Sequence, residues 1–467
     1  MPSPSEILKQ KFPFEATSGQ ARVFDAIDTL IDLKDALVIK GYAGTGKTTL
    51  ISTLVQVLPL FNYKYVLLAP TGRAAKVMAS YSGRMAFTIH KRIYKQANKD
   101  ASGPVFKRQK NYSKKTIFIV DESSMINEDV GFGKKGLLTD LMEYVFSEPS
   151  NKLILVGDNA QLPPVGQIES PALDINVLST DYKLDVVEVL LTEVMRQELE
   201  SGILFNATNL RQELINNPPK VSIDISFSDI FKMTGQRLED GIRYAYDNEG
   251  VENTAILCRS NKNANAYNQY IRNRIFFYDS ELEAGEYLMI VRNNYLFGPE
   301  EIGGGFLANG DFVEAMKIIS FEEIHGFRFA TLELRLTDYP DLRSFEAKVI
   351  LDTLHSETPA LTQDQNEALY QSVALDYADM KQKDRKEAMK TDPYLNALQI
   401  KFAYAITCHK AQGGQWPIVF VDQGYLKDNT IDQDFIRWLY TAITRATKQL
   451  FLVNFNREFF VKSQHKS

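Results

Sequence analysis

The feature that most constrains the fold is the segment Gly-Tyr-Ala-Gly-Thr-Gly-Lys-Thr at residues 41–48. It fits the pattern G-x-x-x-x-G-K-[ST], and it lies between an apolar run at 36–39 and a helical run at 49–58. A glycine-rich loop between a strand and a helix turns its backbone N–H groups toward phosphate oxygens. The sequence therefore predicts a parallel α/β sheet that binds a nucleoside triphosphate.

Two side chains of this loop have defined chemical tasks. Lys47 is expected to reach the β- and γ-phosphates, and the Thr48 hydroxyl is expected to ligate magnesium. The residues predicted to bind the nucleotide in this segment are Gly41, Gly44, Thr45, Gly46, Lys47, Thr48 and Thr49.

Short runs rich in Val, Ile and Leu occur in two sets along the chain. The first set lies at 36–39, 65–68, 116–120 and 153–156, and the second at 254–257, 403–406, 418–421 and 450–453. Runs of this kind, with helical patterns between them, are typical of strands buried on both faces of a parallel sheet. We therefore expect two similar α/β sheets.

Residues 276–395 have a different pattern and interrupt the second set. Segments at 286–291, 311–319, 328–336 and 345–351 look like antiparallel strands separated by Gly, Asn and Pro turns. This pattern predicts a small barrel inserted into an α/β domain. After it, helical spacing predicts one amphipathic helix whose buried stripe is formed by Leu369, Val373, Tyr377 and Met380.

Polar residues that suit hydrolysis follow the third and fourth runs. Asp121 and Glu122 come directly after the run at 116–120, so they project from the carboxyl edge of the predicted sheet. Asp121 can hold magnesium, and Glu122 can orient and deprotonate the attacking water. Gln161 is a candidate sensor of the γ-phosphate, and Pro163 stiffens the loop after it. These residues favour hydrolysis over simple binding.

Two arginines are candidates to stabilise the transition state. Phosphoryl transfer needs positive charge on the developing transition state. Arg196 lies in Leu-Thr-Glu-Val-Met-Arg-Gln, and Arg445 lies in Tyr-Thr-Ala-Ile-Thr-Arg-Ala. We predict that both act on the nucleotide.

The segment 91–115 is the main anomaly in charge. The chain carries a net charge of −6, so a polyanion must be met by a local basic surface. This segment has the single acid Asp100 and interleaved aromatic residues Tyr94, Phe106 and Tyr112. Its basic residues are Lys91, Arg92, Lys95, Lys99, Lys107, Arg108, Lys110, Lys114 and Lys115. Either it is a solvated loop, or it binds phosphates and stacks bases of a single strand.

Composition excludes several other classes of protein. Two cysteines, Cys258 and Cys408, cannot form a four-thiolate zinc site or a disulfide framework, which suits the reducing cytoplasm. No apolar run approaches the roughly 18 to 20 residues that a membrane span needs. Residues 1–16 lack the apolar core of a signal peptide. We expect a cytoplasmic protein that does not enter a membrane.

The ordered motifs of the chain resemble those of superfamily 1 helicases, and most of all the RecD-like branch. They are GYAGTGKT, LLAPTGRAA, FTIHK, IVDESSM, VGDNAQLPPV, LTEVMRQ, AYAITCHKAQGGQW and LYTAITRA, between about residues 20 and 452. The resemblance implies an ATP-dependent helicase that moves 5′-to-3′ along single-stranded DNA and unwinds duplex DNA.

The resemblance also implies a domain organisation. Two RecA-like P-loop domains are expected, the first (1A) at 1–190 and the second (2A) at 191–275 and 396–467. A basic pin (1B) is expected at 91–115, within the first. An SH3-like β-barrel (2B) is expected at 276–395, within the second.

Further site residues follow only from the resemblance. Gln20 matches the glutamine that contacts adenine, which implies ATP with Mg²⁺ as the cofactors. The residues implied to lie along the single strand, or to couple it to ATP, are Pro70, Thr71, Thr88, His90, Pro163, Thr407, His409, Lys410 and Gln412.

The expected partners are single-stranded DNA and junctions of single- and double-stranded DNA. Single-strand-binding or recombination proteins are further candidates, and the chain is expected to work as a monomer. Two alternatives stay open at this point. One is a motor subunit of a helicase–nuclease complex, and the other is a nucleotide-dependent DNA-binding switch. The preferred DNA structure and the role in replication, recombination or repair stay open as well.

Overall fold

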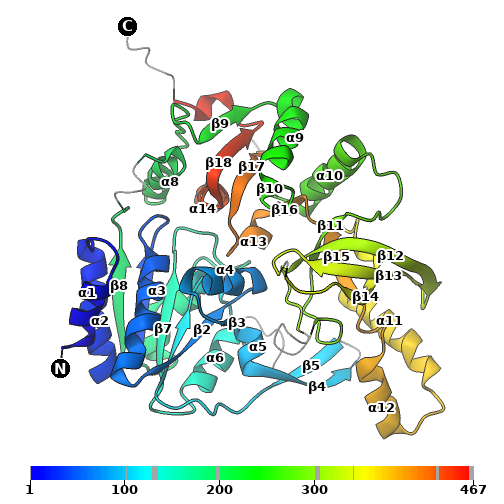
Figure 1. Cartoon of the computed structure of the whole chain (residues 1–467), viewed down its shortest axis with the longest axis horizontal. Helices are drawn as coiled ribbons and strands as arrows, with labels where there is room; N and C mark the ends of the chain where they lie inside the picture. The colour runs from blue at the N-terminus through cyan, green and yellow to red at the C-terminus, as the bar shows by residue number, and fades with distance from the viewer. Residues whose placement is uncertain are drawn as a thin grey trace.

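The computed structural model describes residues 2–100, 103–128, 135–195, 200–299, 306–339, 341–426 and 431–461. Figure 1 shows one sheet with its helices at the lower left, a second sheet above it, and a barrel with two helices to the right.

The first sheet is six-stranded, and every pair of neighbouring strands is parallel. Its order is β3 (Ala86–Thr88), β2 (Lys64–Ala69), β6 (Thr116–Val120), β7 (Lys152–Gly157), β1 (Ala36–Gly41) and β8 (Val186–Leu191). The first set of apolar runs forms β1, β2, β6 and β7, as predicted. The edge strands β3 and β8 were not predicted, because β3 is short and β8 is only partly buried.

Helices cover both faces of this sheet. They are α1 (Pro4–Lys11), α2 (Ser18–Asp32), α3 (Lys47–Val57), α4 (Gly72–Ser82), α5 (Ile89–Ile93), α6 (Leu137–Val145) and α7 (Ile175–Thr180). Successive side chains of a strand point to opposite faces. Accordingly, Leu37 and Ile39 of β1 join the core beside α2 and α3, whereas Ala36 and Val38 join the core beside α6. The sheet is therefore held from both sides.

The second sheet is five-stranded and also parallel. Its order is β16 (Ala405–Thr407), β10 (Thr254–Cys258), β17 (Trp416–Asp422), β18 (Ala446–Val453) and β9 (Ile230–Met233). The helices that follow its strands or precede them are α8 (Gly202–Glu213), α9 (Leu238–Glu249), α10 (Asn261–Ile271), α13 (Cys408–Ala411) and α14 (Gln433–Ile443). The second set of apolar runs forms four of these strands, and only β9 was not predicted.

A closed five-stranded barrel is inserted between β10 and β16. Its strands are β11 (Tyr287–Ile290), β12 (Phe312–Ile324), β13 (Phe327–Leu336), β14 (Phe345–Ile350) and β15 (Leu398–Phe402). The fifth strand closes the barrel by pairing antiparallel with β11 and parallel with β14. Only Ala403 and Tyr404 separate β15 from β16 of the second sheet. The Tyr404 hydroxyl donates to Glu286, 2.8 Å away, just before β11.

The segment after β14 contains two helices, α11 (Gln363–Asp376) and α12 (Gln382–Thr391). Leu369 and Val373 of α11 are buried against the barrel, as the helical spacing predicted. The prediction of one continuous helix was wrong at Met380, which is 48% exposed. The reason is local: α11 ends at Asp376, and the backbone N–H of Met380 donates to the Tyr377 carbonyl in a turn.

A two-stranded hairpin forms within the basic segment. Its strands are β4 (Tyr94–Asp100) and β5 (Gly103–Arg108). Strand β4 contacts α12, and β5 contacts α11, so the hairpin packs against the two helices between β14 and β15 (Figure 1). The first domain and the inserted segment thus touch through this hairpin.

The two sheets and the barrel also meet at the first turn of α4. The Arg73 guanidinium lies 4.2 Å from the ring centroid of Trp416 on β17 and 4.8 Å from that of Phe312 on β12. Its Nη2 donates to the Gln415 carbonyl, 3.2 Å away.

Among the helices that the structure describes, none is long and apolar enough to cross a membrane.

Candidate nucleotide and nucleic-acid site

The glycine-rich loop 41–46 connects β1 to α3 at the carboxyl edge of the first sheet. Gly44 and Gly46 have φ angles of 73° and 80°, in the left-handed region that glycine adopts without strain. A Cβ atom at Gly46 would lie 2.6 Å from Gln20 Nε2 and 2.7 Å from Met195 Sδ. The motif glycine is therefore required by packing as well as by backbone conformation.

Lys47 folds back over this loop. Its Nζ donates to the carbonyls of Gly41 and Tyr42, at 2.7 and 2.9 Å. Thr48 and Thr49 follow in the first turn of α3, where backbone N–H groups lack partners within the helix. The structure thus brings the predicted nucleotide-binding residues of 41–49 into one loop and one helix start.

Gln20 is buried beside the loop. Its Nε2 donates to the Thr45 carbonyl at 3.0 Å, and its Oε1 accepts from the Thr17 backbone N–H at 3.0 Å. The second bond belongs to a capping box at the start of α2. Gln20 therefore fixes the position of the glycine-rich loop against α2.

The acidic pair lies at the end of β6, next to the loop. Asp121 Oδ2 accepts from the Tyr81 hydroxyl at 2.7 Å, and Oδ1 accepts from the Glu122 backbone N–H at 2.8 Å. Glu122 has a φ of 52°, an uncommon conformation for a residue with a side chain. Tyr81 was not predicted, because nothing in the sequence distinguishes it from the other tyrosines of the chain.

Charges from both domains surround Glu122. Burial raises the pKa of the Glu122 carboxyl above its usual value, while the charges of Arg445 and Lys47 act to lower it. Asp121 and Asp158 act in the same direction as burial. A carboxylate at the sheet edge is thus placed within the electrostatic field of Lys47 from the first domain and Arg445 from the second.

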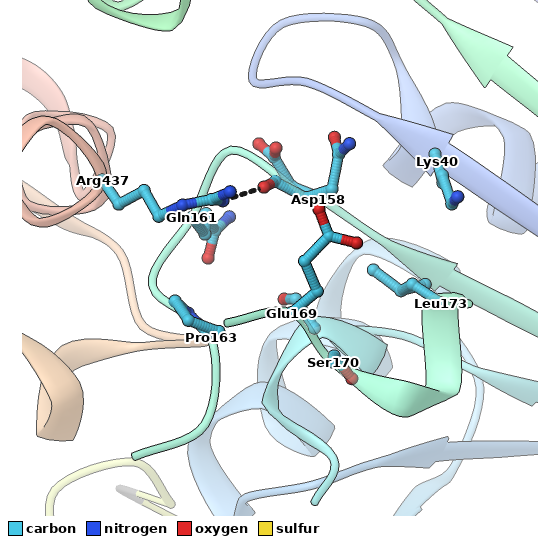
Figure 2. A pocket seen from close by; sticks show the side chains of 10 residues that line it. Lys40, Asp158, Gln161, Pro163, Glu169, Ser170, Leu173 and Arg437 are labelled. Carbon is cyan, nitrogen blue, oxygen red and sulfur yellow. Dashed lines mark hydrogen bonds between the residues drawn. The ribbon is translucent and has the colours of Figure 1, made fainter. Parts of the chain in front are cut away.

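The loop after β7 carries Gln161 and Pro163. Both line a small cavity of about 20 Å³, which Figure 2 shows together with Asp158 and Arg437. Gln161 is 5% exposed, and its Oε1 has no hydrogen-bond partner in the described part of the chain. Its amide oxygen can therefore accept a further hydrogen bond, which suits the predicted role as a sensor.

Helix α14 of the second domain is bound to this loop. The Arg437 guanidinium donates to the Asn159 carbonyl, and the Leu162 backbone N–H donates to Thr441 Oγ1 at 2.8 Å. Gln412 Nε2 donates to the Leu162 carbonyl at 2.7 Å. Gln412 thus contacts the loop that carries Gln161.

The two candidate arginines differ in what the structure describes. Arg445 is buried, and its guanidinium donates to the carbonyls of Thr441 and Gly414, at 3.1 and 3.2 Å. Arg196 lies outside the described residues. The backbone N–H of Met195, just before it, donates to the Gly44 carbonyl at 2.9 Å.

The threonines implied to lie along a strand begin helices. Thr71, after Pro70 at the end of β2, accepts from the Ala74 N–H at 3.2 Å and caps α4. Thr88 accepts from the Lys91 N–H at 3.1 Å and caps α5. Thr407 ends β16 and precedes α13. Helix starts of this kind offer N–H groups to phosphates.

One of the histidines implied to lie along a strand is uncharged at neutral pH. Burial lowers the pKa of His90 to about 4, and partial desolvation lowers the pKa of His409. Lys410 reaches the barrel, where its Nζ donates to Asn309 Oδ1 at 2.8 Å. Helix α13 of the second domain and the loop before β12 therefore meet at this lysine.

Two family models match separate parts of the chain. Residues 25–167 match the AAA domain, and residues 402–453 match the UvrD-like helicase C-terminal domain. The first range contains the glycine-rich loop, the acidic pair and Gln161, and the second contains Lys410 and Arg445.

Three relatives cover different shares of the chain. The protein is 25% identical to the uncharacterized protein R530 of Acanthamoeba polyphaga mimivirus, over 88% of this chain and 93% of R530. It is 28% identical to the ATP-dependent DNA helicase Dda of phage T4, over 62% of this chain and 64% of Dda. It is 30% identical to the ATP-dependent RecD2 DNA helicase of Deinococcus radiodurans, over 37% of this chain and 21% of RecD2. The chain is therefore homologous to the DNA helicases Dda and RecD2.

Proposed function

We propose that the protein is an ATP-dependent DNA helicase that moves 5′-to-3′ along a single strand and separates the duplex ahead of it. One observation carries this proposal: helix α14 of the second domain, which leads to Arg445, is hydrogen-bonded both to Ala43 of the glycine-rich loop and to the loop that carries Gln161. A nucleotide at the glycine-rich loop would lie next to both domains, so its hydrolysis could change how the domains sit against each other.

The residues of the site fit ATP with Mg²⁺. Magnesium prefers hard oxygen ligands and is commonly held by one or two protein groups together with substrate phosphates. The Asp121 carboxylate and the Thr48 hydroxyl are such groups, and the Tyr81 hydroxyl orients the carboxylate at 2.7 Å. The bound ion would neutralise charge on the phosphates. Gln20, which already holds Thr45, would lie next to the base.

Hydrolysis is assigned to side chains from both domains. Glu122 would accept a proton from the attacking water, and Gln161 would orient that water through its free amide oxygen. Lys47 and Arg445 would stabilise the negative charge that develops on the transferred phosphoryl group. Arg196 is proposed for the same role.

The strand would lie across both domains. Pro70, Thr71, Thr88 and His90 would contact it from the first domain, with Pro163 carrying the signal from the nucleotide. Thr407, His409 and Lys410 would contact it from the second, with Gln412 bound to the loop of Pro163. Contacts of this kind give little sequence preference and a salt slope near −0.7 per phosphate neutralised.

We assign strand separation to the basic hairpin β4–β5 as the pin 1B. We keep the predicted domains 1A, 2A and 2B, except that 2B extends to Phe402, because β15 closes the barrel and was predicted to belong to 2A. Contact of the hairpin with α11 and α12 supports this role, because a pin must resist the force of the duplex. We further propose that the protein works in the cytoplasm as a monomer.

The polarity is tested with matched duplexes that carry either a 5′ or a 3′ single-stranded tail. We expect ATP-dependent strand displacement of the 5′-tailed duplex and at least about tenfold slower displacement of the other. Displacement of only the 3′-tailed duplex would contradict the assigned polarity. Absence of any DNA-stimulated ATP hydrolysis would contradict the function itself and favour a nucleotide-dependent switch.

Strand binding should depend on pH through Lys410. Burial lowers the pKa of Lys410 to about 8, with a further contribution from the charge of Lys401. A lysine is charged below its pKa, so attraction to a phosphate is lost as the pH rises through about 8. If the bound phosphate keeps Lys410 charged, linkage gives a rise in Kd of about tenfold between about pH 7 and pH 9.

Fluorescence anisotropy with labelled oligothymidylate at constant ionic strength measures this dependence. The variant Lys410→Arg is the matched control, because arginine stays charged throughout this range. We expect a flat profile for the variant. Equal slopes for the two proteins would show that Lys410 does not contact the strand.

A further inference from the structure

The hydroxyl of Tyr440 joins three elements that belong to the two domains. It accepts a hydrogen bond from the backbone N–H of Ala43 in the glycine-rich loop, at 2.9 Å. It donates one to Asp158 Oδ2, just after β7, at 2.6 Å. Tyr440 itself lies on α14 of the second domain. One oxygen atom therefore links the nucleotide loop, the strand end that leads to Gln161, and the helix that leads to Arg445.

This arrangement is buried and specific. Tyr440 and Asp158 are each 1% exposed, and Asp158 Oδ1 is occupied by the Ala160 N–H at 2.9 Å. Burial, and after it the charge of Asp158, raises the pKa of Tyr440, so the hydroxyl stays protonated and can donate and accept at once. A buried carboxylate and a buried N–H that lose their shared partner are costly, because water cannot replace it.

Tyr440 is also connected to Arg445 through its own backbone. The Tyr440 carbonyl accepts a hydrogen bond from Thr444 Oγ1 at 2.9 Å. Thr444 Oγ1 in turn accepts one from Arg445 Nη2 at 3.3 Å. The next residue, Thr441, provides the carbonyl that accepts from Arg445 Nε. The position of the Tyr440 hydroxyl against the nucleotide loop therefore sets where the last turn of α14, and with it the Arg445 guanidinium, can lie.

We infer that Tyr440 is a positioning residue that aligns Arg445 with the nucleotide by holding α14 to Ala43 and Asp158. The inference rests on the proposed function, because it concerns the same hydrolysis site. It assigns to Tyr440 no contact with the nucleotide. Its contribution is made in the transition state, when the charge of Arg445 is needed, and not in the binding of ATP.

The test is steady-state ATP hydrolysis by the full chain with saturating single-stranded DNA. Tyr440→Phe keeps the buried ring and removes both hydrogen bonds of the hydroxyl. We expect kcat to fall by about 10- to 100-fold, the range for a lost hydrogen bond to a charged group, while KM for ATP changes by less than about threefold. A fall in affinity with kcat unchanged would overturn the inference.

A double-mutant cycle separates alignment of Arg445 from a general loss of structure. Arg445→Lys keeps a charge but loses the planar guanidinium. If Tyr440 acts through Arg445, Tyr440→Phe should lower kcat much less in the Arg445→Lys background than in the wild type. An equal fold-loss in both backgrounds would show that Tyr440 acts independently of Arg445.

Two further variants keep the test independent of folding defects. Tyr246→Phe is the matched control, since this tyrosine is in α9 of the same domain and its hydroxyl has no hydrogen-bond partner in the described chain. It should leave kcat unchanged. Asp158→Asn keeps the shape of the side chain and should lower kcat without adding to the loss in Tyr440→Phe.

The result is distinguishable from a failure of the proposed function. If the wild-type chain shows no DNA-stimulated hydrolysis, the proposed function fails before Tyr440 is tested. If the wild type is stimulated by DNA and Tyr440→Phe matches it, only the role of Tyr440 fails.

Discussion

Replacing Arg445 with alanine should lower kcat for DNA-stimulated ATP hydrolysis by about 10³- to 10⁵-fold, the range for an arginine that stabilises phosphoryl transfer. The physical reason is its position: its charge acts on Glu122 beside Lys47, although it belongs to the other domain. Binding of ATP to the first domain should change little. Hydrolysis under saturating ATP and single-stranded DNA measures the loss.

The same variant should shift the pH dependence of the residual activity. Arg445 acts to lower the pKa of Glu122, so its removal lets that pKa rise further. A base must be ionised to act, and therefore the acidic limb of the rate profile should move to higher pH. Arg243→Ala is the matched control, because Arg243 is on α9 of the same domain and pairs with Glu239 far from this chemistry. An unchanged profile with unchanged kcat would remove Arg445 from the mechanism.

Replacing Lys47 with alanine should lower ATP hydrolysis by about 10³-fold and abolish strand displacement, because the charge on the β- and γ-phosphates is lost. Strand binding without nucleotide should stay within about twofold of the wild type, since none of the proposed strand contacts involves Lys47. Hydrolysis, displacement and anisotropy assays measure the three quantities.

Lys40→Ala provides the comparison for this variant. Lys40 lies on β1, seven residues earlier, and pairs with Glu188 on the neighbouring strand at 2.6 Å. The Lys40→Ala variant also replaces a lysine, on the strand that leads into the glycine-rich loop. It should leave strand displacement intact. A Lys47→Ala protein that still unwound DNA would show that unwinding does not depend on ATP hydrolysis at this loop.

The sheets and the position of the candidate nucleotide loop could be predicted because their signals are local. Runs such as 116–120 are continuous and apolar, and all five residues of β6 are buried on both faces. The glycine-rich loop needs its glycines because side chains would not fit there. A Cβ atom at Gly46, for example, would lie too close to the Gln20 side chain. Asp121 directly follows one apolar run, and Gln161 follows another after a few residues. This spacing predicts that both lie at the carboxyl edge of the first sheet, where the structure places them.

What the sequence did not reveal depends on contacts between distant segments. Tyr81 and Tyr440 matter only because each hydroxyl meets an aspartate 40 or 282 residues away in the chain. Strand β15 closes the barrel by pairing with β11, more than one hundred residues earlier, and its own five residues carry no sign of that partner. The break before α12 follows from a turn at 377–380 rather than from the apolar spacing.

The short passage from β15 to β16 has a mechanical consequence. Only Ala403 and Tyr404 connect the two strands, and Tyr404 is hydrogen-bonded to Glu286. This connection is too short to let the barrel rotate freely relative to the second sheet. A force on the barrel would therefore be transmitted within a few residues to His409 and Lys410. If these residues contact the strand as proposed, a partner that pulls on the barrel would change that contact without touching the nucleotide.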